Sequence, residues 1–188
     1  MKRLSTIVGL VLLAALLLFP QGCGGIGGQI PLGNRVRFTI AGKGDIVMVL
    51  YKDHAPNTVE NMITLVNNRF YNAIKFHRIV PGFVAQAGDP NTKSLDLDDN
   101  RIGTGGPGYT IPFEENSLRH LRGSVSMARR EGRNTAGSQF FICYNDQPTL
   151  DGDYCVFGHV IEGMNVVDSL VRGDIILHAV VEVGEWVD

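Results

Sequence analysis

Residues 76–89 constrain the fold of this 188-residue chain more than any other stretch. They read Phe-His-Arg-Ile-Val-Pro-Gly-Phe-Val-Ala-Gln-Ala-Gly-Asp, which is two mainly apolar segments on either side of a Pro-Gly dipeptide. A Pro-Gly pair between two apolar runs is typical of a tight turn. The pattern therefore predicts two short, adjacent strands that are joined at Pro81 and Gly82.

This expected hairpin brings unlike side chains together. Side chains alternate between the two faces of a strand, so Phe76, Arg78 and Val80 should share one face of the first strand. Val84 and Gln86 should share one face of the second. A guanidinium and a carboxamide then lie beside apolar side chains on neighbouring strands. The pattern alone favours an ordinary hairpin in which Arg78 is simply solvated.

Further strand signals are spread over the rest of the chain. Glycine makes up 23 of the 188 residues, which exceeds the typical share of ~7 % and indicates many turns. Alternating or continuous apolar runs are the primary signal of a strand. We expect six more strands, at residues 36–40, 46–51, 123–128, 139–143, 156–160 and 175–183.

Two segments show helical rather than alternating periodicity. Residues 55–67 carry an apolar stripe at helical spacing, and Pro56 suits the first turn of a helix. A second stripe predicts a helix at residues 162–171. A mainly β fold with two distant helices is compatible with an antiparallel barrel whose ends the helices cover, and also with a sandwich.

The N-terminal residues 1–22 predict a targeting signal instead of a folded element. Met1 to Arg3 is basic and residues 4–19 are almost wholly apolar, but sixteen residues are fewer than the roughly 20 that span a membrane. Gly22 and Cys23 follow, which resembles a bacterial lipoprotein signal with Cys23 as the lipidated residue. Pro20 stands where such signals usually carry Leu, so an uncleaved anchor and ordinary secretion stay as alternatives.

Residues 23–34 predict a Gly-rich tether, and residues 35–188 a single folded domain. A flexible tether of this length spans roughly 18 Å. We therefore expect an extracytoplasmic domain held by lipid at the periplasmic face of a bacterial membrane, with inner or outer membrane left open. That compartment permits a disulfide between Cys143 and Cys155, although we expect two buried thiols.

Several classes of function find no support in the sequence. The formal net charge is -2, so nothing indicates nucleic-acid binding. The acidic loop at residues 94–100 resembles a calcium loop, but Arg101 and Pro107 occupy the positions that require Gly and Glu. Motifs of serine hydrolases, zinc proteases and dithiol oxidoreductases are missing. We expect no metal and no cofactor.

The hairpin segment matches, position by position, the signature of the cyclophilin family of peptidyl-prolyl isomerases. A second block at residues 138–143, Ser-Gln-Phe-Phe-Ile-Cys, resembles that family as specifically, and the resemblance extends over residues 36–186. It implies a closed eight-stranded antiparallel barrel capped by two α-helices. It also implies an isomerase that acts on proline-containing polypeptides and assists protein folding.

The resemblance assigns roles to individual residues. Arg78 matches the family's catalytic Arg, and Gln86 matches the Gln that orients this Arg and contacts the substrate. His77 should point to the opposite face, as a structural histidine with satisfied hydrogen bonds. The substrate-binding positions are Phe83, Val84, Ala128, Arg129, Gln139, Phe141, Leu150 and Tyr154.

Three departures separate this chain from many eukaryotic members. Thr149 stands where they carry Trp, and Tyr154 stands where they often carry His. The segment 127–134 is one residue longer, which blurs the alignment at Arg129 and Arg130. The departures imply weak binding of cyclosporin, the cyclic peptide that binds many family members.

Two functional classes stay open on the sequence. The first is a tethered prolyl isomerase, which we expect to be a monomer. The second is a module that binds proline-containing segments without turnover, and the joint presence of Arg78 and Gln86 favours the enzyme over it. A barrel with an apolar ligand inside is disfavoured, because large side chains such as Phe38, Phe76 and Phe140 would fill a small interior.

Overall fold

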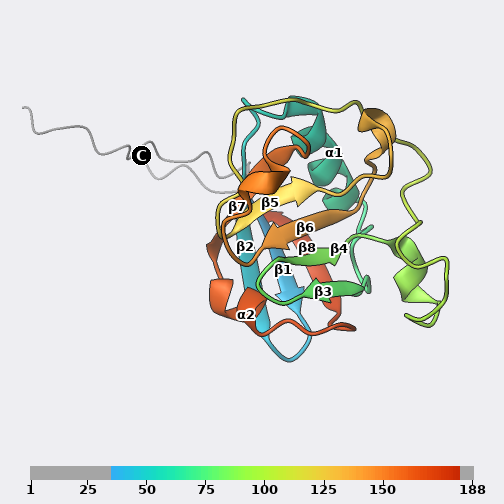
Figure 1. Cartoon of the computed structure of the whole chain (residues 1–188). Coiled ribbons are helices and arrows are strands. Elements are labelled where there is room, and N and C mark those ends of the chain that lie inside the picture. Colours follow the sequence, from blue (N-terminus) through green and yellow to red (C-terminus); the bar gives the residue numbers. More distant parts are fainter. Residues whose placement is uncertain (1–34, 183–188) are drawn as a thin grey trace, which may run out of the picture.

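The computed structural model describes residues 35–182 of the chain. Eight antiparallel strands form one curled sheet in the order β3-β4-β6-β5-β7-β2-β1-β8 (Figure 1). The predicted signal peptide, the tether and Cys23 lie outside the described residues. The strands are β1 (Arg35–Ile40), β2 (Gly44–Leu50), β3 (Arg78–Val80), β4 (Val84–Ala87), β5 (Ser124–Met127), β6 (Phe140–Cys143), β7 (Val156–Glu162) and β8 (Ile176–Glu182).

The sheet is a half-barrel, so the expected closed barrel overstated its closure. Strands β3 and β8 form the two edges of the sheet and share no ladder. One isolated bridge, between Lys75 and Ile175, joins the segments that precede them. The backbone N–H of Phe76 also donates to the carbonyl of Asp174 at 2.9 Å. With only three residues, β3 is too short to pair along the seven residues of β8.

Helix α1 (Pro56–Asn67) lies where the apolar stripe predicted it. Its buried side chains include Val59 and Met62, which face the sheet. No side chain of the preceding residue caps its N-terminus; instead Glu114, far along the chain, accepts hydrogen bonds from the backbone N–H groups of Asn57 and Thr58 at 2.9 and 2.8 Å. These bonds satisfy donors that the first turn of a helix leaves without partners.

Helix α2 (Met164–Asp168) is shorter than the predicted helix. Its N-terminal boundary moves because β7 continues to Glu162 and Gly163 then turns the chain with φ +86°. A Cβ at position 163 would lie 2.1 Å from the carbonyl oxygen of Asp45. Glycine is therefore required where β7 passes into α2. In Figure 1, α1 and α2 lie at opposite ends of the curled sheet.

Aromatic side chains fill the inside of the half-barrel. The ring centroids of Phe38, Tyr71 and Phe140 lie 5.5 to 5.8 Å apart, and all three side chains are fully buried. Residues 46–50 of β2 are buried on both faces, as predicted. A packed interior of this kind leaves no room for a large apolar ligand.

The prediction that Phe76 shares a face with Arg78 is wrong. Phe76 is fully buried and packs beside Phe140, whereas Arg78 is exposed on the opposite side of the sheet. The strand ladder begins only at Arg78, so the chain at Phe76 and His77 does not follow strand alternation. The predicted alternation holds within the ladder itself, from Arg78 onward.

The structure also bears on the predictions for the two cysteines and the acidic loop. Cys143 and Cys155 are free, buried thiols, as favoured; burial raises the pKa of Cys143 to about 12 and that of Cys155 to about 11. In the acidic loop, Asp98 pairs with Arg172. Within residues 35–182 no cluster of His, Cys, Asp or Glu is arranged to hold a metal ion, and no helix is long and apolar enough to cross a membrane.

Candidate active site

The β3–β4 hairpin places Arg78 and Gln86 side by side. The two residues are direct cross-strand partners, as are Val80 and Val84. Because partners in an antiparallel ladder project to the same face, both polar side chains lie on the outer face of the sheet. The Arg78 guanidinium carbon lies 5.9 Å from the ring centroid of Phe83. This contact holds the cation at the edge of an apolar surface.

An apolar pocket of about 220 Å³ opens beside this pair. Val84 and Phe141 line its buried base and form one apolar cluster with Cys143, against which partly buried apolar side chains pack. The structure brings nine of the ten predicted site residues to this pocket. Its lining consists of Arg78, Phe83, Val84, Gln86, Ala128, Arg129, Phe141, Leu150 and Tyr154.

A second cavity, of about 170 Å³, adjoins the apolar pocket. We call it the adjoining pocket. The two share Gln86, Ala128 and Arg129 as lining residues, so they lie side by side. Gln139, the tenth predicted site residue, lines the adjoining pocket and not the apolar one. The rest of its lining is Gly103, Gly105, Gly106, Tyr109, Thr110, Arg130, Thr135, Gly137 and Ser138.

The amide of Gln86 contacts Gln139, and the orienting role that the resemblance implied for Gln86 stays a prediction. Nε2 of Gln86 donates to Oε1 of Gln139 at 3.0 Å. Nε2 of Gln139 in turn donates to the carbonyls of Gly103 and Gly105, each at 2.9 Å. Among the described residues, no hydrogen bond joins Gln86 to Arg78. Gln139 thus links Gln86 to the Gly-rich loop, whereas the Arg78 guanidinium lies beside the Phe83 ring.

Asp89 holds the same Gly-rich loop from beneath, a role that the sequence did not indicate. The Asp89 carboxylate is fully buried. It accepts hydrogen bonds from the backbone N–H groups of Asn91, Gly103 and Gly105. A Cβ at position 105 would lie 2.0 Å from Oδ1 of Asp89. Glycine at this position therefore allows the loop to approach the carboxylate and form the wall of the adjoining pocket.

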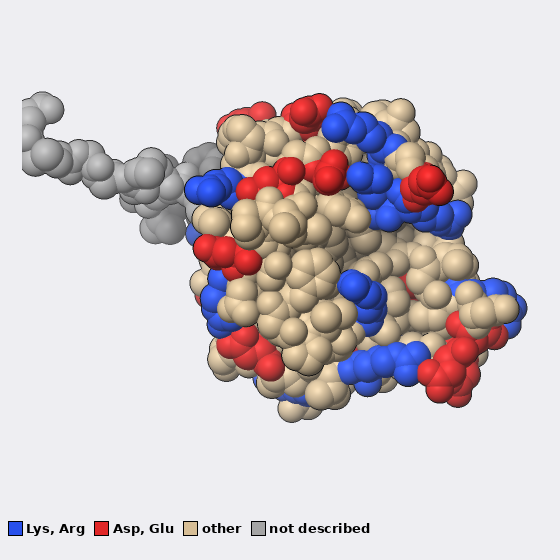
Figure 2. Space-filling model, viewed as in Figure 1, with Lys and Arg blue, Asp and Glu red and all other residues tan. Residues whose placement is uncertain are grey.

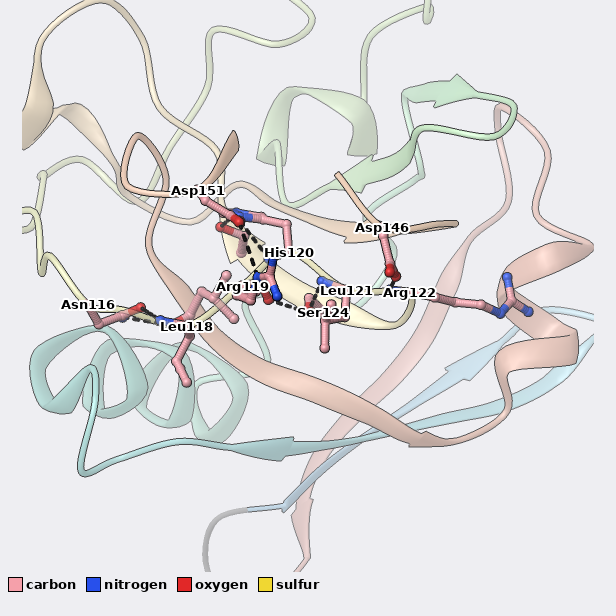
Figure 3. A network of polar contacts seen from close by, with 11 residues as sticks. Asn116, Leu118, Arg119, His120, Leu121, Arg122, Ser124, Asp146 and Asp151 are labelled. Atoms are coloured by element: carbon pink, nitrogen blue, oxygen red, sulfur yellow. Dashed lines mark hydrogen bonds and ion pairs between the residues drawn. The ribbon is translucent and has the colours of Figure 1, made fainter. Parts of the chain in front are cut away.

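His120 supports the base of the apolar pocket from inside the protein. Its ring stacks on Phe141 with a centroid distance of 6.0 Å and an interplanar angle of 15°. Nδ1 contacts Oδ1 of Asp151 at 2.9 Å, and Nε2 contacts Oγ of Ser126 at 3.1 Å. Figure 3 shows His120 and Asp151 directed toward each other. Hydrogen bonds from the backbone and ring of His120 hold the pKa of Asp151 below its usual value.

Ser126, His120 and Asp151 are the residue types of a hydrolytic triad, but they cannot act as one. The Ser126 side chain is fully buried and His120 is 1 % exposed. A nucleophile must reach the substrate, and neither pocket includes Ser126 in its lining. The contacts therefore position Phe141. They also attach Asp151, and with it the short 3₁₀ turn that ends at Leu150, to β5.

His77 is buried, yet it lacks the satisfied hydrogen bonds that were expected. It is 7 % exposed, and neither ring nitrogen has a hydrogen-bond partner among the described residues. Burial lowers its pKa, because the charged imidazolium would lose solvation. Burial therefore favours the neutral ring, and His77 is not among the residues that line the pocket beside Arg78.

The geometry of the site indicates the class of protein. An apolar pocket for one small ring, bordered by a guanidinium and a carboxamide, suits an extended polypeptide. Among the described residues its lining contains no Ser, Cys, Lys, Asp or Glu side chain. Such a site suits the binding of a peptide that contains a small apolar ring.

Comparison with known sequences identifies the family. A family model described as cyclophilin type peptidyl-prolyl cis-trans isomerase/CLD matches residues 35–182. The chain therefore belongs to the cyclophilin-type peptidyl-prolyl cis-trans isomerases and is an enzyme of that class. A peptidyl-prolyl cis-trans isomerase of Helicobacter pylori is 46% identical over 138 residues, covering 71% of this chain and 78% of the relative. Peptidyl-prolyl cis-trans isomerase B of Bacillus subtilis is 41% identical over 152 residues, covering 80% and 92%.

Solved structures show the same fold. The cyclophilin AquaCyp293 of Hirschia baltica superposes with a TM-score of 0.70 at 23% identity, covering 81% of this chain and 75% of that one. A Cryptosporidium parvum cyclophilin type isomerase, solved in the presence of the dipeptide Ala-Pro, has a TM-score of 0.70 at 29% identity and covers 80% and 99%. These neighbours agree with the half-barrel described above.

Proposed function

We propose that this isomerase accelerates rotation about X-Pro bonds in polypeptides outside the cytoplasm and thereby assists their folding. One observation carries the proposal: Arg78 and Gln86 border the apolar pocket on a single face of the β3–β4 hairpin. A pyrrolidine ring fits a pocket of about 220 Å³ that is lined mainly by apolar and aromatic side chains. The neighbouring polar groups are within reach of the peptide bond that precedes such a ring.

The reaction needs only selective stabilisation of a twisted amide. Rotation about an X-Pro bond meets a barrier of about 18–20 kcal/mol, because the C–N bond has partial double-bond character. In the twisted transition state the nitrogen regains a lone pair, which can accept a hydrogen bond. A donor directed at this nitrogen stabilises the twisted form more than the planar form. We assign this donor to Arg78.

The other residues of the site hold the substrate on either side of the rotating bond. Phe141 and Leu150 provide apolar contact for the ring, while Gln86 and Gln139 present amide groups to the peptide backbone. Because Gln139 is fixed to the Gly-rich loop, these amides are preorganised and lose little freedom when substrate binds. One part of the peptide is therefore held while the other rotates.

A turnover assay tests the enzymatic proposal against the binding-module alternative. Cis-to-trans rates on a blocked chromogenic X-Pro peptide should rise in proportion to the concentration of the enzyme. Slow refolding of a protein limited by proline isomerisation should accelerate as well. A module that only binds would delay refolding at stoichiometric concentration and leave the peptide rate unchanged, and that result would overturn the proposal.

We further propose that lipid on Cys23 tethers the enzyme to the periplasmic face of a bacterial membrane. The basic start, the short apolar run and the Gly-rich segment after Cys23 support this location. Mass spectrometry of the mature N-terminus should find Cys23 as the first residue with acyl chains attached. Cys23→Ser should leave the protein unprocessed or soluble. An unmodified Cys23 in a soluble mature chain would contradict the tether.

We also propose that the enzyme is a monomer, which light scattering of the domain would test.

A further inference from the structure

The arginines around the two pockets differ from most other arginines in residues 35–182, because no carboxylate of that range pairs with them. Three line the pockets: Arg78, Arg129 and Arg130. In the part of the chain that the structure describes, none of the three lies within ion-pair distance of an Asp or Glu. Those that do form such pairs are Arg37, Arg101, Arg119, Arg122, Arg133 and Arg172.

Arg129 and Arg130 contact uncharged groups instead of a carboxylate. Nε of Arg129 donates to the carbonyl of Asp153 at 2.9 Å, and its guanidinium carbon lies 5.0 Å from the ring centroid of Tyr154. A guanidinium N–H of Arg130 donates to the carbonyl of Thr104. These contacts hold both side chains over the groove, but they leave the positive charges without neutralisation.

The positive character of the groove is local. The chain as a whole has a formal net charge of -2, and no Asp or Glu is among the residues that line either pocket. Figure 2 shows Lys and Arg side chains on the rim of the hollow on this face of the molecule. An extended peptide in the groove therefore meets cationic donors that no acidic side chain of the lining offsets.

We propose that the enzyme prefers substrates that carry an acidic side chain close to the isomerised X-Pro bond. The carboxylate lies in the adjoining pocket beside Arg129 and Arg130 while the proline ring occupies the apolar pocket. The two pockets share three lining residues, and an extended chain advances about 3.3 Å per residue, so we expect the acidic residue within three positions of the proline, on one side of it. A guanidinium can donate two parallel hydrogen bonds to a carboxylate, which suits it to this recognition.

This inference rests on the proposed isomerase activity and adds the class of substrate. It is tested with blocked X-Pro peptides in which a single Glu or Gln occupies each of three positions on either side of the proline. We expect Glu to raise kcat/KM about two- to fivefold over Gln at one or two positions, which is the range of exposed ion pairs. The preference should shrink at 1 M salt, where charges are screened within ~3 Å.

Two matched variants locate the effect. Arg130→Gln should bring the Glu-to-Gln ratio of kcat/KM toward one at the preferred position. Arg69→Gln removes the same charge from an arginine that also lacks a carboxylate partner in the described structure but lines neither pocket, so the ratio should stay as in the wild type. Circular dichroism confirms that both variants are folded.

The possible failures are distinguishable. If no peptide is isomerised, the proposed function is wrong. If Glu and Gln peptides are isomerised equally at every position, the proposed isomerase activity is supported and the acidic preference is wrong. A Glu preference that survives Arg130→Gln, or that Arg69→Gln abolishes, would overturn the assignment to the adjoining pocket.

Discussion

Phe140 and Phe141 are neighbours on β6, yet they belong to different regions of the molecule. Phe140 is fully buried inside the half-barrel and contacts Phe38, Tyr71 and Phe76. Phe141 is 5 % exposed and lies on the outer face, where it forms part of the apolar pocket. One sheet thus carries a packed aromatic core on one face and a groove for substrate on the other.

The two regions are held together by different means. The core is stabilised mainly by apolar contact, with one hydrogen bond from the buried Tyr71 hydroxyl to the carbonyl of Ser138 at 3.0 Å. The groove depends more on polar contacts behind its surface. Asp89 holds its Gly-rich wall, and His120 holds its base. The groove must stay open for substrate, so side chains cannot pack across it and stabilise it as they do in the core. Buried hydrogen bonds beneath its walls supply the rigidity that packing supplies in the core.

The largest expected effect is a difference in the free energy of unfolding between variants at the two phenylalanines. Phe140→Ala should lower the free energy of unfolding by about 3–5 kcal/mol, because it removes a large side chain from a closed core. Phe141→Ala should destabilise the domain less but weaken substrate binding by about 1.5–3 kcal/mol. Urea unfolding and KM on an X-Pro peptide measure the two effects. Equal loss of stability in both variants would break the distinction between core and groove.

The second prediction concerns catalysis without loss of fold. Arg78→Ala should lower kcat/KM by about 10²–10³, which corresponds to the loss of one well-placed donor worth about 2.7–4 kcal/mol. Arg78→Lys should recover little, since an ammonium lacks the planar fork of a guanidinium. Because Arg78 is exposed, circular dichroism and urea unfolding should match the wild type. A folded Arg78→Ala variant with near-wild-type turnover would falsify the assigned role.

The third prediction tests the polar support of the groove. Asp89→Ala should cost roughly 1–3 kcal/mol, because it leaves buried backbone N–H groups without their acceptor. Amide hydrogen exchange at Gly103 and Gly105 should accelerate more than exchange at Phe140 in the core. Asp99→Ala is the control, since that carboxylate is in the same loop and contacts only Arg101 on the surface. Uniform acceleration in both regions would show that Asp89 supports the whole fold instead of the groove.

The fourth prediction concerns pH and the buried His77. Burial lowers its pKa in the folded protein, so below about pH 6.5 the unfolded chain binds a proton that the folded chain does not. The full stability is therefore present at pH 7.5 and is lost progressively as the pH falls below 6.5 toward the lower pKa of the folded protein. His77→Leu should reduce this loss in urea unfolding between pH 7.5 and 5.5. His159, whose pKa burial also lowers, should account for part of the remainder. An unchanged pH dependence in His77→Leu would contradict the account.

The smallest expected effect concerns cyclosporin at the rim of the groove. We expect weak inhibition, because Thr149 offers neither the area nor the N–H donor of an indole. Thr149 lies in the 3₁₀ turn Pro148–Leu150, next to Leu150 of the apolar pocket. Thr149→Trp should improve inhibition by up to about tenfold, on the scale of one aromatic contact. Equal inhibition of both forms would contradict the alignment of this turn with the family.

The sequence by itself determined the local elements and most of the site. Apolar periodicity located all eight strands and helix α1, because the faces that an element buries determine the spacing of its apolar residues. The Pro-Gly turn predicted adjacent strands that bring Arg78 and Gln86 near each other, and the structure then paired the two residues directly. The resemblance then indicated the residues that the fold gathers at the two pockets, whose roles stay predictions until they are measured.

Tertiary structure alone decided how these elements end and what supports them. The sheet stays open because β3 is short, and α2 begins late because Gly163 passes close to Asp45. Gln86 is fixed by Gln139, 53 positions away, and His120 meets Asp151 across 31 positions. Such contacts have no local pattern, since each partner is an ordinary polar residue until the chain brings the two together and excludes water from around them.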